Sequence, residues 1–332
     1  MRRVGAASER CTAGGGGWVA RYARRMITAL AGGVGAARFL RGLVQVVDPA
    51  EVTVVVNTAD DDWFHGLYVC PDLDSVTYTL AGAQNPDTGW GLAGETFASI
   101  EALARYGEDT WFRLGDRDLA THLFRTRLLR EGATLSEATE RVTAAWDLGP
   151  RLLPMTDDRV ATRITTPAGE LAMQEWFVRE RCEPPVVGVH FEGADDAEPA
   201  PGVLEAIAAA DTVLVCPSNP VISIAPILAV PGMRDALVAR RERVVGVSPI
   251  IAGRPVKGPA DRLMGPMGID VSCVGVAREY RAFCSALVID TGDAAHAAEI
   301  EGLGVRAVVA DTLMTDARVA AALARDTLAA VA

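Results

Sequence analysis

The sequence predicts an α/β protein of the three-layer, Rossmann-like kind, with a mostly parallel sheet and an inserted small α+β subdomain. Short apolar runs rich in Val recur along the 332 residues, and segments with helical spacing separate most of them. Such runs are typical of strands that are buried on both faces of a parallel sheet. Between 117 and 180 the pattern changes to the alternation of antiparallel hairpins. We therefore expect a core domain made of residues 26–116 and 181–332, and an inserted subdomain at 117–180.

The predicted sheet begins with a β-α-β unit. Residues 27–30 form a short apolar run, glycines at 32–35 turn the chain, and residues 36–47 have helical spacing. Asp48 and Pro49 end this helix, because proline interrupts helical hydrogen bonding. The all-β-branched run at 52–56 supplies the second strand. The crossover between the two strands should be right-handed.

The remaining elements follow from the same two patterns of spacing. Further helices are predicted at 74–81, 95–106, 118–130, 134–146 and 315–330. Antiparallel hairpin strands are predicted within 151–179, where apolar residues alternate around Thr162 and Ile164, Leu171 and Met173, and Trp176 and Val178. Further strands of the parallel sheet are predicted at 186–189, 212–216, 244–247, 286–289 and 307–309.

Charge and cysteine usage exclude several classes of protein. The formal net charge is −11, and residues 1–25 contain six Arg and one Glu, so the remaining chain carries −16. Nucleic-acid binding is not expected from such an acidic body, because phosphate contacts need clustered Lys and Arg. The six cysteines lack C-x-x-C spacing and only four histidines are present, which disfavours a structural zinc site or a disulfide framework. Reduced thiols indicate a cytoplasmic protein.

Two features concern membranes and the chain start. No apolar run approaches the ~18 residues of a membrane span, so no membrane partner is expected. Residues 1–25 are rich in Arg and Gly and lack apolar periodicity. We interpret them as a disordered extension, with Met26 as the functional start.

An acidic loop, residues 57–62, directly follows the strand predicted at 52–56. In open α/β sheets, ligands bind outside the carboxyl ends of the strands. Asp60, Asp61 and Asp62 are consecutive carboxylates at that place. Mg²⁺ suits such a site, because it takes one or two carboxylates and completes its shell with water and substrate phosphates. The alternative is a solvated acidic turn.

The glycine turn lies at a second strand end. Gly32, Gly33 and Gly35 would let backbone N–H groups approach a phosphate at a helix start. The turn is not a P-loop, since no Gly-Lys-Ser/Thr follows, and Arg38 stands where a dinucleotide fingerprint requires its third glycine. Tight packing explains these glycines equally well.

Two later loops occupy the same position after predicted strands. Ser218 and Asn219 follow the strand at 212–216, and their hydroxyl, amide and backbone donors can hold a nucleotide base or phosphate. The alternative is an ordinary helix cap. A third loop starts at Ser248 and supplies a cation at Lys257.

Charged residues flank the acidic loop in two segments. Asp72 and Asp74 stand at the start of a predicted helix, where either can cap it. Residues 112–118 alternate charges, including Arg113, between two apolar stretches. A structural ion-pair network is the alternative to a binding role for this second segment.

These segments together resemble a known family, the 2-phospho-L-lactate transferases of coenzyme F420 biosynthesis. The resemblance runs from Met26 to the C-terminus through the strings LAGGVGAARFLRGL, VVVNTADDDWFHGLYVCPDLDSVTYTLAG, RLGDRDLATHL, RLLPMTDD, PSNPVISIAPIL and SPIIAGRPVKGPA. It implies transfer of a phospholactyl group from a guanosine-diphosphate-activated donor to Fo, the deazaflavin precursor, with release of GMP. In actinobacterial members, the phosphoenolpyruvate transferases, the donor is enolpyruvyl-diphosphoguanosine and the product is dehydro-F420-0. The chain is rich in Arg, Gly and Ala, a composition typical of a high-GC actinobacterium. This favours the enolpyruvyl donor.

The resemblance also implies roles for individual residues. Asp60 is similar to the family's metal-associated aspartate. On chemical grounds, the neighbouring Asp61 is expected to assist it in holding Mg²⁺. Asp74 and Arg113 match positions that contact Fo, and Asp74 is expected to orient the Fo hydroxyl and accept its proton. Ser218 and Asn219 lie in the loop that holds the guanine nucleotide, with Gly32, Gly33 and Gly35 beside the same cleft. A homodimer is expected from the family.

Two other classes of function are weighed against this one. A nucleotide-sugar-binding regulator of the gluconeogenesis-factor type has a similar fold and a strand followed by an Asp-Asp loop. In that family glycine and serine follow the acidic pair, whereas residues 63–66 here are Trp-Phe-His-Gly. A dinucleotide-dependent oxidoreductase is disfavoured by Arg38 and by the lack of an acidic residue ending the second strand in the ribose-binding manner.

Overall fold

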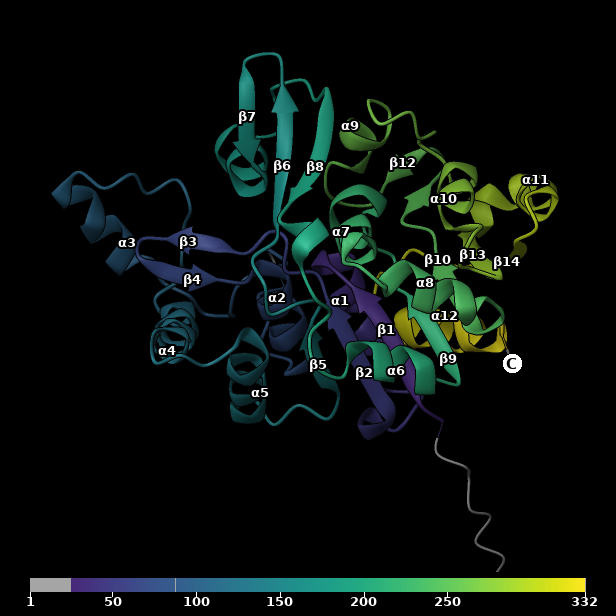
Figure 1. Ribbon diagram of the computed structural model, residues 1–332, viewed down its shortest axis with the longest axis horizontal. Helices are drawn as coiled ribbons and strands as arrows, with labels where there is room; N and C mark the ends of the chain where they lie inside the picture. Colours follow the sequence, from purple (N-terminus) through teal and green to yellow (C-terminus); the bar gives the residue numbers. More distant parts are fainter. Residues whose placement is uncertain (1–24, 87, 332) are drawn as a thin grey trace, which may run out of the picture.

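A seven-stranded parallel sheet with helices on both faces forms the centre of the protein (Figure 1). The computed structural model describes residues 25–86 and 88–331. Neighbouring strands in this sheet are all parallel, which confirms the predicted α/β fold class. In sheet order the strands are β14 (Arg306–Ala310), β13 (Ala286–Asp290), β10 (Val244–Val247), β9 (Thr212–Val215), β1 (Ile27–Ala31), β2 (Val52–Val56) and β5 (Arg151–Pro154).

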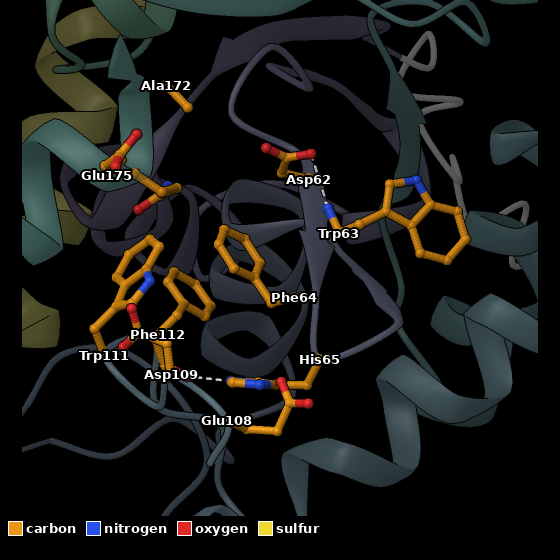
Figure 2. A pocket seen from close by; sticks show the side chains of 11 residues that line it. Asp62, Trp63, Phe64, His65, Glu108, Asp109, Trp111, Phe112, Ala172 and Glu175 are labelled. Atoms are coloured by element: carbon orange, nitrogen blue, oxygen red, sulfur yellow. Dashed lines mark hydrogen bonds between the residues drawn. The ribbon is translucent and has the colours of Figure 1, made fainter. Parts of the chain in front are cut away.

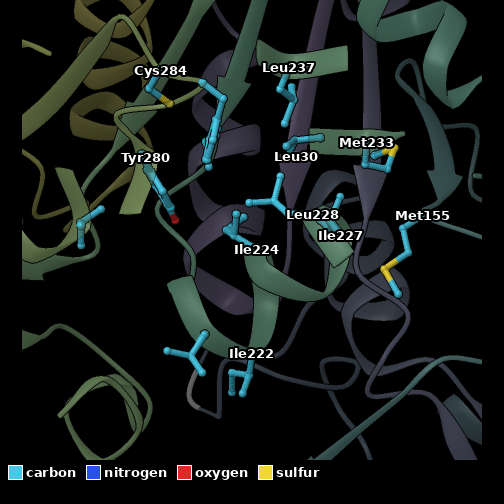
Figure 3. Close-up of a cluster of buried hydrophobic side chains, with 14 of the residues drawn as sticks. Leu30, Met155, Ile222, Ile224, Ile227, Leu228, Met233, Leu237, Tyr280 and Cys284 are labelled. Atoms are coloured by element: carbon cyan, nitrogen blue, oxygen red, sulfur yellow. The ribbon is translucent and has the colours of Figure 1, made fainter. Parts of the chain in front are cut away.

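The three layers follow from the alternation of side chains along each strand. Ala29 and Ala31 pack toward one helical layer, whereas Leu30 between them packs toward the other. The first layer contains α1 (Gly33–Leu43), α2 (Pro71–Leu80), α5 (Leu135–Ala145) and α12 (Ala317–Ala329). The second contains α6 (Val203–Ala209), α7 (Ala225–Ala229), α8 (Met233–Ala239), α9 (Ala260–Met264), α10 (Cys273–Tyr280) and α11 (Ala297–Gly302). Figure 3 shows Leu30 among the side chains of this second layer.

Most helices lie where helical spacing predicts them, although their ends differ. The helix at 118–130 is observed as α4 (Asp118–Arg130) with the predicted bounds. The first helix starts at Gly33 instead of residue 36, so that its first turn includes the glycine turn after β1. The segment predicted as one helix at 95–106 contains only α3 (Ala98–Leu103) and a further single turn.

The strand β5 corrects the prediction of antiparallel hairpin strands from residue 151 onward. Residues 151–154 were expected in an antiparallel hairpin, but β5 pairs in parallel with β2 at the edge of the central sheet. The predicted boundaries at 117 and 180 therefore do not separate the two sheets. Leu152 and Leu153 are both buried, and a run this short carries no local signal of which strand it will join.

A second correction concerns residues 176–192. The segment at 186–189 was expected in the parallel sheet, but β8 (Gly188–Glu192) pairs antiparallel with β6 (Ala161–Thr166). β7 (Gly169–Ala172) completes this small sheet as predicted, whereas Trp176 and Val178 lie in a helical turn and not in a strand. The alternation of Val189 and Phe191 with exposed His190 and Glu192 is the signal of a sheet with one open face.

A short hairpin after the acidic loop was not predicted. β3 (Asp62–Phe64) pairs antiparallel with β4 (Leu67–Val69). Its two-residue turn, His65-Gly66, has positive φ at both positions, as tight hairpin turns require. One further two-stranded sheet joins β11 (Ile250–Ile251) to β12 (Arg254–Pro255).

Cysteines and helix lengths complete the description of the fold. The five cysteines among the described residues are free and buried. Within residues 25–86 and 88–331, no single helix has the length and apolar character to cross a membrane. Two helical segments, Pro220–Ala229 and Met233–Ala239, meet that test only as a pair bent by 92°.

Candidate active site

The main cleft lies where the order of the central sheet reverses. From β1 the chain continues to β2 and β5 on one side, and later to β9 and β10 on the other. Loops that leave neighbouring strands in opposite directions open a crevice at their carboxyl ends. A cleft of about 510 Å³ lies here, and residues that follow β1, β2, β9, β10 and β14 all line it.

Two carboxylates, those of Asp60 and Asp72, meet at one corner of this cleft. The Asn57 amide Nδ2 donates to Asp60 Oδ2 at 3.4 Å and to Asp72 Oδ2 at 3.0 Å. Asp72 lies in the first turn of α2, and its Oδ1 accepts the N–H of Gly33 at 2.8 Å. Both aspartates line the cleft and are only 8% exposed. We call this pair the acidic corner.

Burial disfavours the charged forms of both carboxylates in the acidic corner. Burial raises the pKa of Asp60 well above its usual value, and the charge of Asp72 raises it further. Burial likewise raises the pKa of Asp72 to about 6, against the hydrogen bonds from Asn57 and Gly33. Asp60 Oδ1 is buried without a hydrogen-bond partner among the described residues. A bound cation would relieve both effects.

The donor set fits Mg²⁺ rather than a metal held wholly by protein. Among the described residues, no group of three or more His, Cys, Asp or Glu side chains is arranged to hold a metal ion. Two carboxylates open to a cleft suit Mg²⁺, which keeps water and substrate oxygens in its shell. Sequence reasoning treated Asp72 only as a helix cap. The sequence signal that could have indicated a site role for Asp72 was the short spacing between the acidic loop and the start of the following helix.

Asp61 and Asp62 lie apart from this corner. Asp61 is buried outside the cleft lining, where burial raises its pKa, and neither carboxylate oxygen has a hydrogen-bond partner among the described residues. Asp62 begins β3 and pairs with Arg159 at 3.2 Å. The structure therefore brings Asp60 together with Asp72 in the cleft, and not with its sequence neighbours.

Asp74 belongs to a buried charged network between α2 and α4. Its Oδ2 accepts from Arg125 Nη1 at 3.1 Å, its Oδ1 contacts Arg125 Nη2, and His122 Nδ1 lies 3.6 Å from Oδ2. His122 Nε2 lies 3.3 Å from Asp118, which also accepts the hydroxyl of Tyr78. Sequence reasoning missed His122 and Arg125. Their spacing from Asp118 places all three on one face of α4.

Arg113 lies at the cleft wall, about half exposed. Its guanidinium stands 4.3 Å from the centre of the Phe97 ring and pairs with Glu101 at 3.4 Å. The preceding Trp111 and Phe112 line both the main cleft and a neighbouring pocket of about 330 Å³. Phe112 stacks against Phe64 with ring centres 3.7 Å apart. Figure 2 shows both side chains in that pocket. Trp111 and Phe112 thus form a wall between the two cavities.

The glycine turn and the Ser218 loop contact each other at the centre of the cleft. Gly32 N–H donates to Ser218 Oγ at 3.3 Å. A Cβ on Gly35 would lie 2.3 Å from the carbonyl oxygen of Pro217, so close packing of α1 on this loop requires glycine there. Asn219 caps the following helical turn, because its Oδ1 accepts the N–H of Val221 at 2.9 Å. All of the predicted loop residues line the cleft, and their packing and capping roles are present in the structure.

Fold and cleft together define a doubly wound α/β protein with its main cleft at the switch point of the sheet. Residues 27–327 match the family model described as 2-phospho-L-lactate transferase CofD. The chain belongs to this transferase family, as the sequence motifs indicated. The match favours the transferase over the regulatory and oxidoreductase alternatives.

Similar proteins bear names within the same family. The chain is 47% identical over 308 residues to the phosphoenolpyruvate transferase of Streptomyces griseus, covering 91% of this chain and 97% of that protein. It is 48% identical over 310 residues to that of Kitasatospora aureofaciens, with the same coverage, and 45% identical over 324 residues to that of Mycobacterium sp. strain JLS, covering 90% and 96%.

Solved structures support the fold alone. A Bacillus halodurans protein, described as a member of the UPF0052 family, superposes with a TM-score of 0.61 at 16% identity. The match covers 92% of this chain and 99% of that one. A second crystal structure of the protein superposes with a TM-score of 0.60.

Proposed function

We propose that this transferase moves a phosphoenolpyruvyl group from a guanosine-diphosphate-activated donor onto the ribityl hydroxyl of Fo. GMP leaves, and the product is dehydro-F420-0 in coenzyme F420 biosynthesis. The observation that carries the proposal is the acidic corner, Asp60 and Asp72, in one cleft with the Ser218–Asn219 loop. The names of the actinobacterial relatives support the enolpyruvyl donor over the 2-phospho-L-lactyl donor, which would yield F420-0.

The chemistry is a displacement at phosphorus. The hydroxyl oxygen of Fo forms a bond to the phosphorus nearer the acid, and the bond from that phosphorus to the oxygen of GMP breaks. GMP departs with the electron pair, and the hydroxyl proton passes to Asp74 Oδ. Such reactions depend on positioning and charge neutralisation more than on covalent catalysis. Mg²⁺, when bound by Asp60 and Asp72, would neutralise charge on the diphosphate oxygens.

The other cleft residues position the two substrates. Asp74 is held in place by buried Arg125, so its carboxylate is oriented before Fo binds. Arg113 would pair with a phosphate or a polar edge of the deazaflavin. Trp111 and Phe112 offer an apolar wall for the flat ring system. Ser218 and Asn219 would hold the guanine nucleotide, beside the glycine turn. Asp61, which lies outside the cleft lining, stays a predicted supporting residue for the metal.

Mass spectrometry of the reaction product tests the proposal. The protein is incubated with Fo, Mg²⁺ and each donor in turn, and we expect a product from the enolpyruvyl donor that is two hydrogens lighter than F420-0. Product formed only from the phospholactyl donor would reverse the donor assignment. Absence of any product, together with thermal stabilisation by UDP-sugars but not by Fo or GDP, would favour the regulatory alternative.

A further inference from the structure

Two cationic side chains, those of Arg38 and Lys257, converge on the main cleft from distant parts of the chain. Arg38 lies on α1, just beyond the glycine turn, and Lys257 follows β12. Both line the cleft. Lys257 Nζ donates to the carbonyl oxygen of Thr88 at 3.0 Å, so the ammonium group is anchored across the cleft rim.

Within residues 25–86 and 88–331, no carboxylate neutralises either of these two cations. Among the described residues, neither Arg38 nor Lys257 forms an ion pair with a carboxylate. Partial burial lowers the pKa of Lys257, and the nearby charge of Arg38 lowers it further. By contrast, Arg113, which also lines the cleft, pairs with Glu101 at 3.4 Å. Like charges brought together in this way favour a bound anion.

The backbone donors of the glycine turn are already used in part. Gly32 N–H donates to Ser218 Oγ, and Gly33 N–H donates to Asp72 Oδ1. The acidic corner beside them repels anions unless a metal is present. An anionic group in this part of the cleft therefore needs side-chain cations, which are stronger donors to phosphate than neutral groups.

We propose that Arg38 and Lys257 form a phosphate subsite, separate from the acidic corner, that holds a phosphate of the nucleotide half of the donor. The assignment rests on the proposed function for the identity of the nucleotide, but not for the presence of an anion site. Arg38, whose position breaks the dinucleotide fingerprint, thereby gains a role in binding. Its planar guanidinium can donate two parallel hydrogen bonds to one phosphate, which a lysine cannot.

Calorimetric titration of the full chain with GDP, GMP, guanosine, inorganic pyrophosphate, phosphoenolpyruvate and Fo, in buffer containing EDTA, tests the subsite without the metal. We expect Arg38→Gln and Lys257→Gln each to weaken GDP and pyrophosphate binding by about tenfold to a hundredfold, the range of charge-assisted hydrogen bonds. Guanosine and Fo should bind as tightly as to the unmodified protein. Arg38→Lys should fall between Arg38→Gln and the unmodified protein.

Arg254→Gln is the matched control, because Arg254 is exposed on the hairpin strand just before Lys257 and does not line the cleft. It should bind GDP like the unmodified protein. Equal losses of GDP affinity in Arg254→Gln and Lys257→Gln would overturn the proposal. It would also be overturned if Arg38→Gln and Lys257→Gln lost phosphoenolpyruvate binding while GDP binding stayed intact. If the unmodified protein binds pyrophosphate but not GDP, and Arg38→Gln binds neither, the subsite stands while the proposed nucleotide is wrong. Unchanged Fo binding shows that each variant is folded.

Discussion

At the scale of single residues, the acidic corner is the feature with the strongest consequences. Asp60 and Asp72 share one amide donor, Asn57, and burial raises the pKa of both. A site that disfavours its own negative charge is suited to a cation, and the cleft leaves room for substrate oxygens in the cation's shell.

We expect Asp60→Asn and Asp72→Asn each to reduce transferase activity by about 100-fold or more, since each removes a charge that would hold Mg²⁺ at the diphosphate. Mn²⁺ binding, followed by electron paramagnetic resonance, should weaken in both variants. Asp62→Asn is the control, because Asp62 pairs with Arg159 outside the cleft. Full activity of Asp60→Asn with unchanged Mg²⁺ dependence would show that the metal lies elsewhere.

At the scale of elements, the contact of α1 with the loop after β9 shapes the centre of the cleft. Gly35→Ala would place a Cβ 2.3 Å from the Pro217 carbonyl oxygen, so the helix or the loop must move. We expect a loss of about 1–3 kcal/mol in the free energy of unfolding, typical of overpacking. GDP binding should weaken with it. Urea unfolding and calorimetry measure the two effects.

Gly302→Ala at the end of α11 is the control for this substitution, because a Cβ there would meet nothing within 4 Å. It should leave stability and GDP binding nearly unchanged. If Gly35→Ala behaved in the same way, close packing of α1 on the Pro217 loop would not be needed for the cleft.

The ion pair between Asp74 and Arg125 joins α2 to α4. Arg125→Met would leave a buried carboxylate without its partner, and we expect a loss of about 3–5 kcal/mol in the free energy of unfolding. Arg127→Met on the same helix removes an exposed pair with Glu131 and the contact of the Arg127 guanidinium with the Phe124 ring, and it should cost less than about 1 kcal/mol. Similar unfolding midpoints for the two variants in urea would contradict the structural role of the network.

At the scale of the whole molecule, the raised carboxyl pKa values link stability to pH. For Asp72 the pKa rises from 3.8 to about 6, and the pKa values of Asp60 and Asp61 are raised as well. At pH values between the pKa of the unfolded chain and that of the folded protein, the folded protein holds protons that the unfolded chain has released. The free energy of unfolding therefore falls as pH rises from about 4 through about 6. Carboxyl groups with a lowered pKa, such as those of Asp118 and Asp290, change the free energy of unfolding at lower pH values than these.

Melting temperatures measured in EDTA between pH 5 and pH 8 check this linkage. We expect a fall with rising pH to which Asp72 contributes on the order of 1 kcal/mol or more. Asp61→Asn should raise the melting temperature near pH 7.5 and flatten the profile. Mg²⁺ should stabilise the unmodified protein at the same pH, because it binds the folded state. A profile that rises from pH 5 to pH 8 in EDTA would contradict the raised pKa values.

The sequence by itself determined the class of fold and the positions of the loops that line the cleft. Runs such as 52–56 are β-branched throughout, which is typical of a strand covered on both faces, and Asp60 and Ser218 lie in the loops that follow such runs. These signals are local, so they can be read without knowing which strands become neighbours. The resemblance of the motifs added the family, which the family model confirms.

Only the tertiary structure decided which of these residues meet. The chain pattern did not show that β5 joins the central sheet while β8 leaves it, because strand pairing depends on topology and not on periodicity. For the same reason Asp72 became the partner of Asp60, Arg125 the partner of Asp74, and Lys257 the neighbour of Arg38. Contacts between residues distant in sequence depend on how the layers pack, and that information is not carried by any one segment.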